Sequence, residues 1–224
     1  IRGVFKYAYE ADLIERPVKF GPNFKKPNAK TMRKHRASQP EKFFEAEEIR
    51  DMLKQASPIL KAMILLGVNC GFGPHDCGQL TKDVVDLDAG FIDFARSKTG
   101  AKRRNPLWPE SIAAIRDAIS PANESLVFVT SKGNPWAVGK SQLVSEQMRY
   151  VMESAGCHVV GRGHYALRHV LETVGGETKD QVAVNALMGH IDNSMAATYR
   201  ERISDERLVA VTDHVRKWLF GTIE

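Results

Sequence analysis

Two neighbouring stretches decide the fold: GHYALRHVLETVG at residues 163–175 and ALMGHIDNSMAATYRERI at residues 186–203. Apolar residues recur at helical spacing, which predicts one helix over 164–174 and another over 179–188. The first carries L-R-H near its start. The second ends in L-M-G-H, where the glycine is typical of a helix end. A tyrosine, Tyr199, follows nine residues after that histidine.

Similar periodicity extends on both sides of this region. It predicts further helices over 41–55, 58–68, 109–119, 138–155 and 205–219. The segments FIDFA (91–95) and RNPLW (104–108) flank a polar turn and predict a β-hairpin. LVFVT (126–130) predicts one more short strand. The fold class expected is mostly α with a small antiparallel β-sheet, an α+β domain that starts at about residue 41.

Composition is that of an ordinary globular protein. The chain has 224 residues, 43% of them hydrophobic, and 32 Lys and Arg against 27 Asp and Glu give a net charge of +5. This length fits one domain and part of a second. The longest apolar stretch, AMILLGV (62–68), is far shorter than the ~20 residues that cross a bilayer. Cys70, Cys77 and Cys157 include no C-x-x-C and no metal-ligand spacing, which predicts free thiols in an intracellular, reducing compartment.

Positive charge is concentrated in one N-terminal segment. No acidic residue lies between Glu15 and Glu41, whereas eight Lys and Arg and four Pro accumulate there. Such a segment fits a linker that follows a phosphate backbone, because each bound cation releases a counterion. A solvated tether fits equally well. The cations expected at DNA are Lys25, Lys26, Lys30, Arg33, Lys34 and Arg36.

The motifs resemble those of one known family. An L-R-H near a helix start, a helix ending in L-M-G-H and a tyrosine nine residues later are the ending of phage-integrase-type tyrosine recombinases. The R-S-K-T-G turn at 96–100 resembles the family's hairpin lysine motif, and residues 41–80 resemble its opening helices. The resemblance covers about 180 of the 224 residues. It implies the tyrosine recombinase catalytic-domain fold over 41–224, a basic linker over 21–40, and the end of a truncated N-terminal core-binding domain over 1–20.

In that family a tyrosine hydroxyl attacks a DNA phosphodiester, which gives a 3′-phosphotyrosine and a free 5′-hydroxyl without metal or cofactor. The resemblance assigns the nucleophile to Tyr199, phosphate clamping to Arg168 and a phosphate hydrogen bond to His190. A phenol with a pKa of ~10 is a weak nucleophile at neutral pH, so cations must stabilise the developing charge. Lys98 at the hairpin tip would protonate the leaving 5′-oxygen. Lys102, Arg103 and Arg104 are expected to face backbone phosphates.

The family's first arginine is missing from NCGFGPHDCGQL. The spacing to Asp76 and Leu80 puts Gly73 at the arginine position. A lost transition-state phosphate ligand would cost ~10³ to 10⁵ in rate. The candidates for a compensating group are His75, Arg103 and Arg104.

A second departure is Tyr165, which stands where most members carry His. Its hydroxyl would hydrogen-bond a phosphate oxygen, or its ring would pack beneath the helix, and the residues alone do not separate these roles. His164 is an alternative shifted by one residue. Consecutive helix positions lie ~100° apart, however, so the two side chains are expected to face different ways.

We expect a site-specific DNA recombinase or integrase that acts on double-stranded DNA as a homo-oligomer, a tetramer on paired sites, in the bacterial cytoplasm with the nucleoid. The C-terminal segment SDERLVAVTDHVRKWLFG either docks on a neighbouring subunit or packs on its own domain. One alternative is a DNA-binding protein on the same scaffold that no longer cleaves, which Gly73 favours. Another is a type IB topoisomerase, which would be expected to keep the first arginine. The recombinase is favoured because the residues expected to carry the chemistry are all present at the family's motif positions: Lys98, Arg168, His190 and Tyr199.

Overall fold

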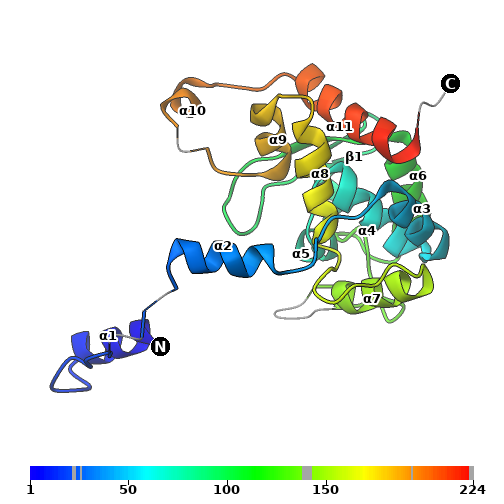
Figure 1. The fold of residues 1–224 in the computed structure, drawn as a ribbon. Coiled ribbons are helices and arrows are strands. Elements are labelled where there is room, and N and C mark those ends of the chain that lie inside the picture. The colour runs from blue at the N-terminus through cyan, green and yellow to red at the C-terminus, as the bar shows by residue number, and fades with distance from the viewer. Residues whose placement is uncertain (22–23, 26, 138–142, 193, 222–224) are drawn as a thin grey trace. The chain divides into compact units, whose positions relative to one another are not determined.

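The chain folds as two units, Ile1–Glu41 and Lys42–Glu224, in a computed structural model that describes residues 1–21, 24–25, 27–137, 143–192 and 194–221 (Figure 1). The first unit contains α1 (Arg2–Glu10) and α2 (Ala29–Ala37), and neither helix buries a residue. The sequence did not predict α2, which lies inside the expected linker. Its start is fixed by Asn28, whose side chain accepts a hydrogen bond from the Thr31 N–H at 2.8 Å.

The second unit is mostly helical with a small sheet, as the sequence predicts. Strands β1 (Val85–Asp86), β2 (Phe91–Asp93) and β3 (Arg104–Pro106) form one antiparallel sheet in the order β1-β2-β3. A 3-10 turn, η1 (Lys82–Val84), leads into it. The helices are α3 (Ala46–Gln55), α4 (Pro58–Asn69), α5 (Pro74–Gly78), α6 (Pro109–Ala118), α7 (Leu143–Ser154), α8 (Ala166–Gly176), α9 (Gln181–Met188), α10 (Met195–Tyr199) and α11 (Asp205–Phe220).

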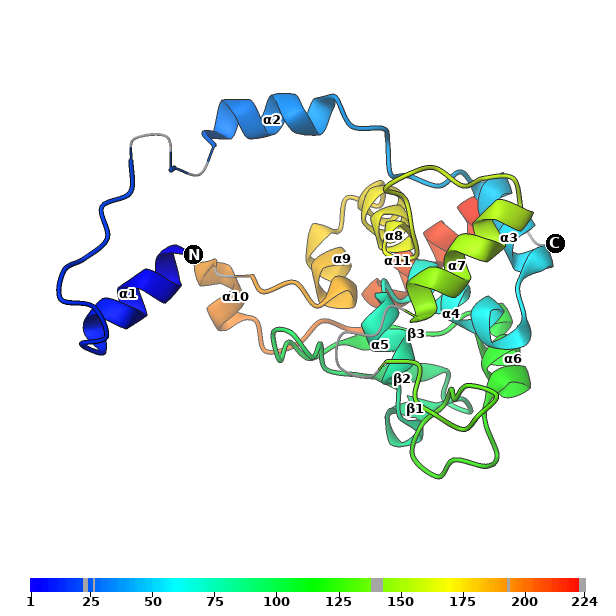
Figure 2. The same cartoon turned by 90° about the horizontal axis from the view of Figure 1, so that it is seen from below.

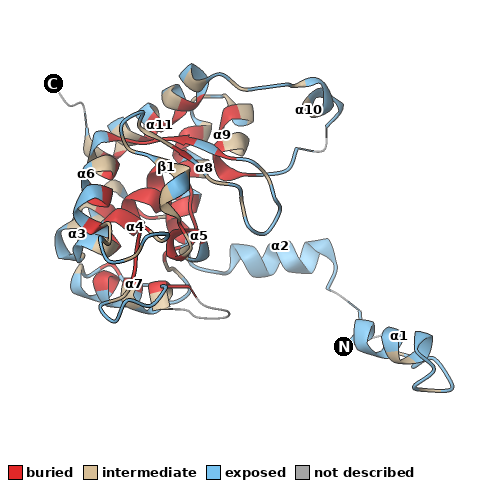
Figure 3. Cartoon of the chain, turned by 180° about the vertical axis from the view of Figure 1, so that it is seen from behind, coloured by how far each residue is buried: buried red, intermediate tan, exposed pale blue. Residues whose placement is uncertain are grey.

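Helix α4 is the centre of the core. Every residue from Ala62 to Asn69 is buried, which explains why this segment is apolar on all faces (Figure 3). It packs against α6 and α8. A Cβ added at Gly67 would lie 2.8 Å from Cδ1 of Leu167 on α8. Only glycine therefore allows α8 to approach α4 this closely, and this approach sets where the L-R-H motif lies.

The predicted strand at 126–130 is wrong. Its residues form only two isolated bridges, Thr81 to Leu126 and Val129 to Pro135. The Val127 N–H donates to the carbonyl of Leu80 at 2.9 Å, so this segment bonds to the chain before β1 rather than to the sheet. The third strand is β1, whose two residues are too short for an alternating pattern. Two short helices, α5 and α10, were also not predicted, and residues 138–142 of the predicted helix over 138–155 lie outside the described residues.

Helix α11 packs on its own domain, which is one of the two possibilities that the sequence leaves open. Leu208, Val211, Val215 and Leu219 are buried against the core that α3, α8 and α9 share with it. The Trp218 ring meets Phe43 edge-on, with 5.7 Å between the ring centroids. Among the described residues, none of the helices is long and apolar enough to cross a membrane. All three cysteines are free and buried.

Candidate active site

Two helix ends meet at this site. Gly71 after α4 and Gly189 after α9 have φ of +64° and +60°, a left-handed backbone that glycine adopts without the steric cost of a Cβ. After α9, the N–H of His190 donates to the Asn185 carbonyl at 2.9 Å and closes the turn. The L-M-G-H motif is therefore a helix end that places His190 beside the site. The side chain of Arg168 enters between the two turns.

Arg168 is buried and held by backbone carbonyls. Its Nη1 donates to the Gly71 carbonyl at 2.5 Å and its Nη2 donates to the Met188 carbonyl. A guanidinium has five N–H donors, so three remain for an anion. Burial lowers the pKa of Arg168, and the nearby charges of Arg96 and Arg103 lower it further. The three guanidinium groups share one neighbourhood, because Arg96 and Arg168 donate to the carbonyls of Gly189 and Met188 and the Arg103 side chain lies against Gly189. An arriving phosphate would relieve their repulsion.

His190 lies beside this cluster with 40% of its side chain exposed. Its Nδ1 is 3.4 Å from Oδ1 of Asn185 and 3.8 Å from Oε2 of Glu172. Gln181 donates to both of those side chains, at 2.9 Å to Glu172 and 3.2 Å to Asn185, and so holds them in place. Burial and then Arg168 lower the pKa of His190, while Glu172 opposes the shift. Burial and the charge of Arg168 therefore both favour the neutral imidazole.

The predicted hairpin is confirmed by β2 and β3, with Lys98 exposed in the turn between them. Arg96 closes the base of that turn. Its N–H donates to the Ala101 carbonyl at 2.8 Å, and its own carbonyl accepts the N–H of Gly100 at 2.7 Å. The Arg96 side chain points back toward the helix end, where Nη1 donates to the Gly189 carbonyl at 3.3 Å.

The expected phosphate contact of Arg103 is wrong. Its side chain is 0% exposed, and Nη2 and Nη1 donate to the two carboxylate oxygens of Asp76 at 3.0 and 3.3 Å. Burial of the planar fork against Asp76 takes this cation away from DNA. Arg104 is half-exposed but pairs with Asp93 at 2.7 Å and with Asp205 at 2.8 Å. Neither arginine is thus a free cation that could replace the family's first arginine.

The turn at Gly73 lies under Tyr165. A Cβ added at Gly73 would be 3.4 Å from the Tyr165 ring, an ordinary contact, and the φ of Gly73 is −85°. A side chain at this position therefore fits the backbone. Tyr165 is 49% exposed on this side, whereas His164 is buried and its Nε2 lies 3.0 Å from the Met63 carbonyl. The shifted alternative, His164, is consequently a core residue, and His75 is exposed.

Tyr199 is the last residue of α10 and is 77% exposed. No residue of α10 is buried. In both views this short helix is separated from α8 and α9 by the stretches of chain that connect it (Figure 1, Figure 2). An ion pair between Arg200 and Asp192, at 3.3 Å, ties the two ends of this arm together. The structure therefore brings Arg168 and His190 together but leaves Tyr199 on an exposed arm.

Comparison of the chain with known proteins identifies its family. A sequence profile described as the phage integrase family matches residues 42–206, which include both turns, the hairpin and the exposed tyrosine. The chain belongs to the phage integrase family. No curated protein sequence matches it.

Solved structures of this family show the same fold. The integrase from mycobacterium phage Brujita is 19% identical, with a TM-score of 0.62 over 100% of this chain and 74% of its own. The lambda integrase(75-356) dimer bound to a COC' core site is 16% identical, with a TM-score of 0.59 over 91% of this chain and 72% of its own. XerA recombinase is 18% identical, with a TM-score of 0.56 over 93% and 71%. The predicted fold class and family resemblance are both confirmed.

The basic segment of this integrase-family chain is exposed in the first unit. Helix α2 carries Lys30, Arg33, Lys34 and Arg36, contains no acidic residue and buries none of its side chains. Lys25 is exposed as well, and Lys26 lies outside the described residues. In the second unit, Lys102 is exposed on the hairpin. DNA contacts by these residues remain predictions.

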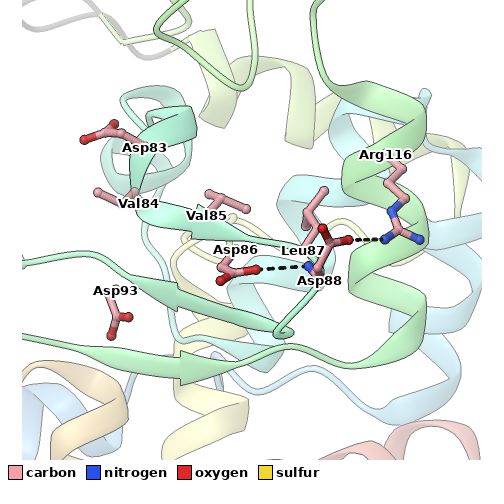
Figure 4. Close-up of a pocket in the computed structure, with 8 residues that line it drawn as sticks. All are labelled: Asp83, Val84, Val85, Asp86, Leu87, Asp88, Asp93 and Arg116. Carbon is pink, nitrogen blue, oxygen red and sulfur yellow. Dashed lines mark hydrogen bonds and ion pairs between the residues drawn. The ribbon is translucent and has the colours of Figure 1, made fainter.

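A hollow beside β1 has the wrong charge for a nucleic acid. It is lined by Asp83, Asp86, Asp88 and Asp93, with Arg116 at its edge (Figure 4). Arg116 is already paired with Asp88 at 3.4 Å. Among the described residues, no group of His, Cys, Asp and Glu side chains is arranged to hold a metal ion. The cationic cluster around Arg168 is therefore the better candidate site for a nucleic acid.

Three groups of this integrase-family site were not predicted from the sequence. Arg96 lies in the quoted R-S-K-T-G turn, yet nothing in the turn signals that its side chain folds back onto a distant helix end. Glu172 lies four residues after Arg168 on α8, a spacing that places both on one helix face and is the one signal that the sequence offered. Asn105 has no local signal. Its Nδ2 donates to the carbonyls of Cys70 and Leu187, at 3.3 and 3.2 Å, and so ties β3 to both helix ends.

Proposed function

We propose that this chain is the catalytic part of a site-specific DNA recombinase that cleaves and rejoins double-stranded DNA through a 3′-phosphotyrosine. The observation that carries the proposal is the position of Arg168, held between two helix-end carbonyls with His190 beside it and N–H donors to spare. A preorganised cation of this kind stabilises charge that develops on a phosphate. The solved relatives include lambda integrase, a dimer of which is bound to a core site.

The chemistry needs no external energy. The Tyr199 oxygen attacks phosphorus, the bond from phosphorus to the 5′-oxygen breaks, and one phosphodiester replaces another. The phenolic proton passes to solvent, and Lys98 donates a proton to the leaving 5′-oxygen. Arg168 holds non-bridging oxygens through its free N–H groups, and this contact strengthens as the pentavalent state gains charge. The reverse sequence rejoins the strand.

Tyr199 must move before it can attack, because it lies on an exposed arm. An in-line attack needs the nucleophile about 3 to 3.5 Å from phosphorus. Helix α10 must therefore approach the cluster when DNA is bound. Tyr165, half-exposed over Gly73, is an auxiliary group whose hydroxyl would reach a phosphate oxygen. Tyr165→Phe keeps the ring and removes only that hydroxyl, so an unchanged cleavage rate would assign Tyr165 to packing.

The decisive experiment is an SDS-resistant adduct assay. Wild type, Tyr199→Phe and Gly73→Arg are incubated with supercoiled DNA that carries the sequences flanking the gene. We expect an adduct with wild type and none with Tyr199→Phe. An adduct formed only by Gly73→Arg would show an intact scaffold in a protein that binds DNA without cleaving it.

That outcome is the second candidate function, and Gly73 favours it. A glycine provides no phosphate ligand, and the loss of such a ligand costs ~10³ to 10⁵ in rate. The Cβ contact of 3.4 Å and the φ of −85° allow a side chain to begin at this position. Gly73→Arg therefore separates a decayed site from a site that has replaced the ligand. Relaxation of DNA that lacks the flanking sequences would instead indicate a topoisomerase.

DNA affinity is proposed to come largely from the basic segment. Replacing Lys25, Lys30, Arg33, Lys34 and Arg36 with alanine removes five cations. We expect the slope of log K against log salt to become less steep by roughly 4 to 5, because each neutralised phosphate contributes about −0.9. An unchanged slope would show that this segment is only a tether.

We also propose a homo-oligomer on paired sites. The solved relatives include a lambda integrase tetramer bound to a Holliday junction. Because α11 buries its apolar face in its own domain, a contact through the C-terminal helix is limited to its exposed face. Ala210 lies on that face. Ala210→Arg should reduce the size of the complex on DNA and leave the monomer folded, and an unchanged complex would exclude this face.

We further propose that the protein is located inside the cell, with DNA, which fits its three free and buried thiols.

A further inference from the structure

Arg96 is the cation of the cluster whose guanidinium is least engaged by the described residues. Arg103 is neutralised by Asp76 and is fully buried. Arg168 is held by two carbonyls. For Arg96, the described residues offer no carboxylate within ion-pair distance, and the one hydrogen bond of its guanidinium, to the Gly189 carbonyl at 3.3 Å, is long for an N–H donor. Most of its donors are therefore free for a ligand.

Arg96 belongs to the site by position. Its Cβ would lie 3.3 Å from a Cβ added at Gly189, the residue that turns the chain into His190. Its charge acts on both Arg168 and His190 and lowers the pKa of each. Arg96 donates to the Gly189 carbonyl and Arg168 donates to the carbonyl of the preceding residue, Met188, so the two guanidinium groups bind successive carbonyls of one helix end. An anion that binds Arg168 and His190 would then be within the field of Arg96.

The backbone of Arg96 is fixed while its side chain stays adaptable. Hydrogen bonds from its N–H and to its carbonyl close the base of the tip turn, where Gly100 has the left-handed φ of +68°. The anchored backbone holds the long side chain over the helix end. A weak bond to one carbonyl costs little to exchange for a charged phosphate oxygen, since hydrogen bonds between two charged groups are the stronger ones.

We propose that Arg96 is a further catalytic residue, which binds a non-bridging oxygen of the scissile phosphate opposite Arg168 and supplies the contact that Gly73 cannot make. This inference rests on the proposed recombinase function. Arg96 replaces the three compensating groups that the sequence suggested, His75, Arg103 and Arg104. Arg103 and Arg104 are engaged by carboxylates, and His75 lies exposed in the α5 turn. The hairpin then carries two cations for the reaction, Arg96 for charge and Lys98 for the proton.

The test is a double-mutant cycle in the adduct assay. Arg96→Ala should lower the rate of adduct formation by about 10² to 10³, the usual cost of one transition-state donor, with DNA retention within about threefold of wild type. Gly73→Arg should raise the rate at least tenfold more in the Arg96→Ala background than in wild type. Arg116→Ala is the matched control, because it removes the same charge from the acidic hollow near β1. A rate for Arg96→Ala within threefold of Arg116→Ala would overturn the proposal.

A second measurement does not depend on cleavage. Inorganic phosphate is titrated into the ¹⁵N-labelled protein while the arginine Nε–H resonances are followed, and Arg96→Lys identifies the Arg96 signal by its loss. We expect the Arg96 and Arg168 signals to shift along one saturation curve. A shift of Arg168 alone, or of neither, overturns the role of Arg96 even if wild type cuts DNA. Absence of an adduct in wild type, with both signals shifting, refutes the recombinase function and leaves the anion site in place.

Discussion

Removal of the Asp76 carboxylate should destabilise the catalytic unit more than any surface change near the site. Oδ1 and Oδ2 accept two hydrogen bonds from Arg103, at 3.0 and 3.3 Å, and Oδ2 also accepts the N–H of Gly73 at 3.0 Å. The Arg103 side chain is 0% exposed and that of Asp76 is 11% exposed. In Asp76→Ala the guanidinium stays buried without its counter-charge. It keeps the Phe94 carbonyl, at 2.9 Å, and the rings of Phe72 and Phe94.

The magnitude follows from this burial. Breaking a buried ion pair by removing one partner costs about 3 to 5 kcal/mol. For a domain of this size, each kcal/mol shifts the Tm by about 2 to 4 °C, so the midpoint should fall by roughly 6 to 20 °C. Asp76→Asn keeps an oxygen for the Gly73 N–H and removes the charge. It isolates the ion pair from the turn.

Urea unfolding followed by tryptophan fluorescence measures these costs. The double variant Asp76→Leu with Arg103→Met replaces the pair by apolar side chains and should be less destabilised than Asp76→Ala alone, because no charge is left buried and unpaired. A cost below about 1 kcal/mol for Asp76→Ala would refute the reasoning. The reasoning would also be refuted if the cost of the double variant equals the sum of the costs of Asp76→Leu and Arg103→Met measured singly, because the effects of independent sites add.

Three further outcomes are expected. Burial lowers the pKa of His164 from 6.5 to about 4, so its unfolded form takes up a proton first and stability is lost as pH falls from 6.5 towards 4. Urea unfolding at a series of pH values should show that the free energy of unfolding of His164→Gln falls by about 3 kcal/mol less than that of wild type over this range. An equal fall in both proteins would contradict this. Leu219→Ala should cost about 2 to 5 kcal/mol in the isolated monomer because Leu219 is 0% exposed, whereas a cost under 1 kcal/mol would place α11 elsewhere in solution. Arg104→Ala removes a partly exposed pair with Asp205 and should cost less than about 1 kcal/mol in low salt and nothing measurable at 1 M salt; a salt-independent loss would indicate a buried role.

Local patterns in the sequence predicted most of the helices and the glycine turn after α9. The apolar spacing over α4, α8 and α9 comes from burial of one face or, for α4, of all faces, and this is a property of each segment alone. Gly189 ends α9 because a left-handed residue is needed there. For the same reason Gly100 fits the hairpin turn. Motifs made of such segments were enough to assign the family.

Side-chain partners that are distant in sequence could not be predicted. Arg103 and Arg104 are adjacent and look alike in the sequence, yet one is buried with Asp76 and the other lies at the surface with Asp205. Successive side chains at the start of β3 point to opposite faces, and only the tertiary fold brings Asp76 of α5 to the Arg103 side chain. The predicted phosphate contact of Arg103 failed for this reason, whereas that of the exposed Arg104 stays a prediction.

The sequence by itself determined the order of helices and hairpin, the family and the candidate residues Tyr199, Arg168, His190 and Lys98, because short-range periodicity and motif spacing depend on nearby residues. The tertiary structure alone decided which cations are free. Burial and pairing depend on contacts between segments far apart in the chain, such as Arg96 against Gly189. It also decided that α11 packs on its own domain. An amphipathic pattern shows that a helix packs against an apolar surface, but not whether that surface belongs to the same chain or to another.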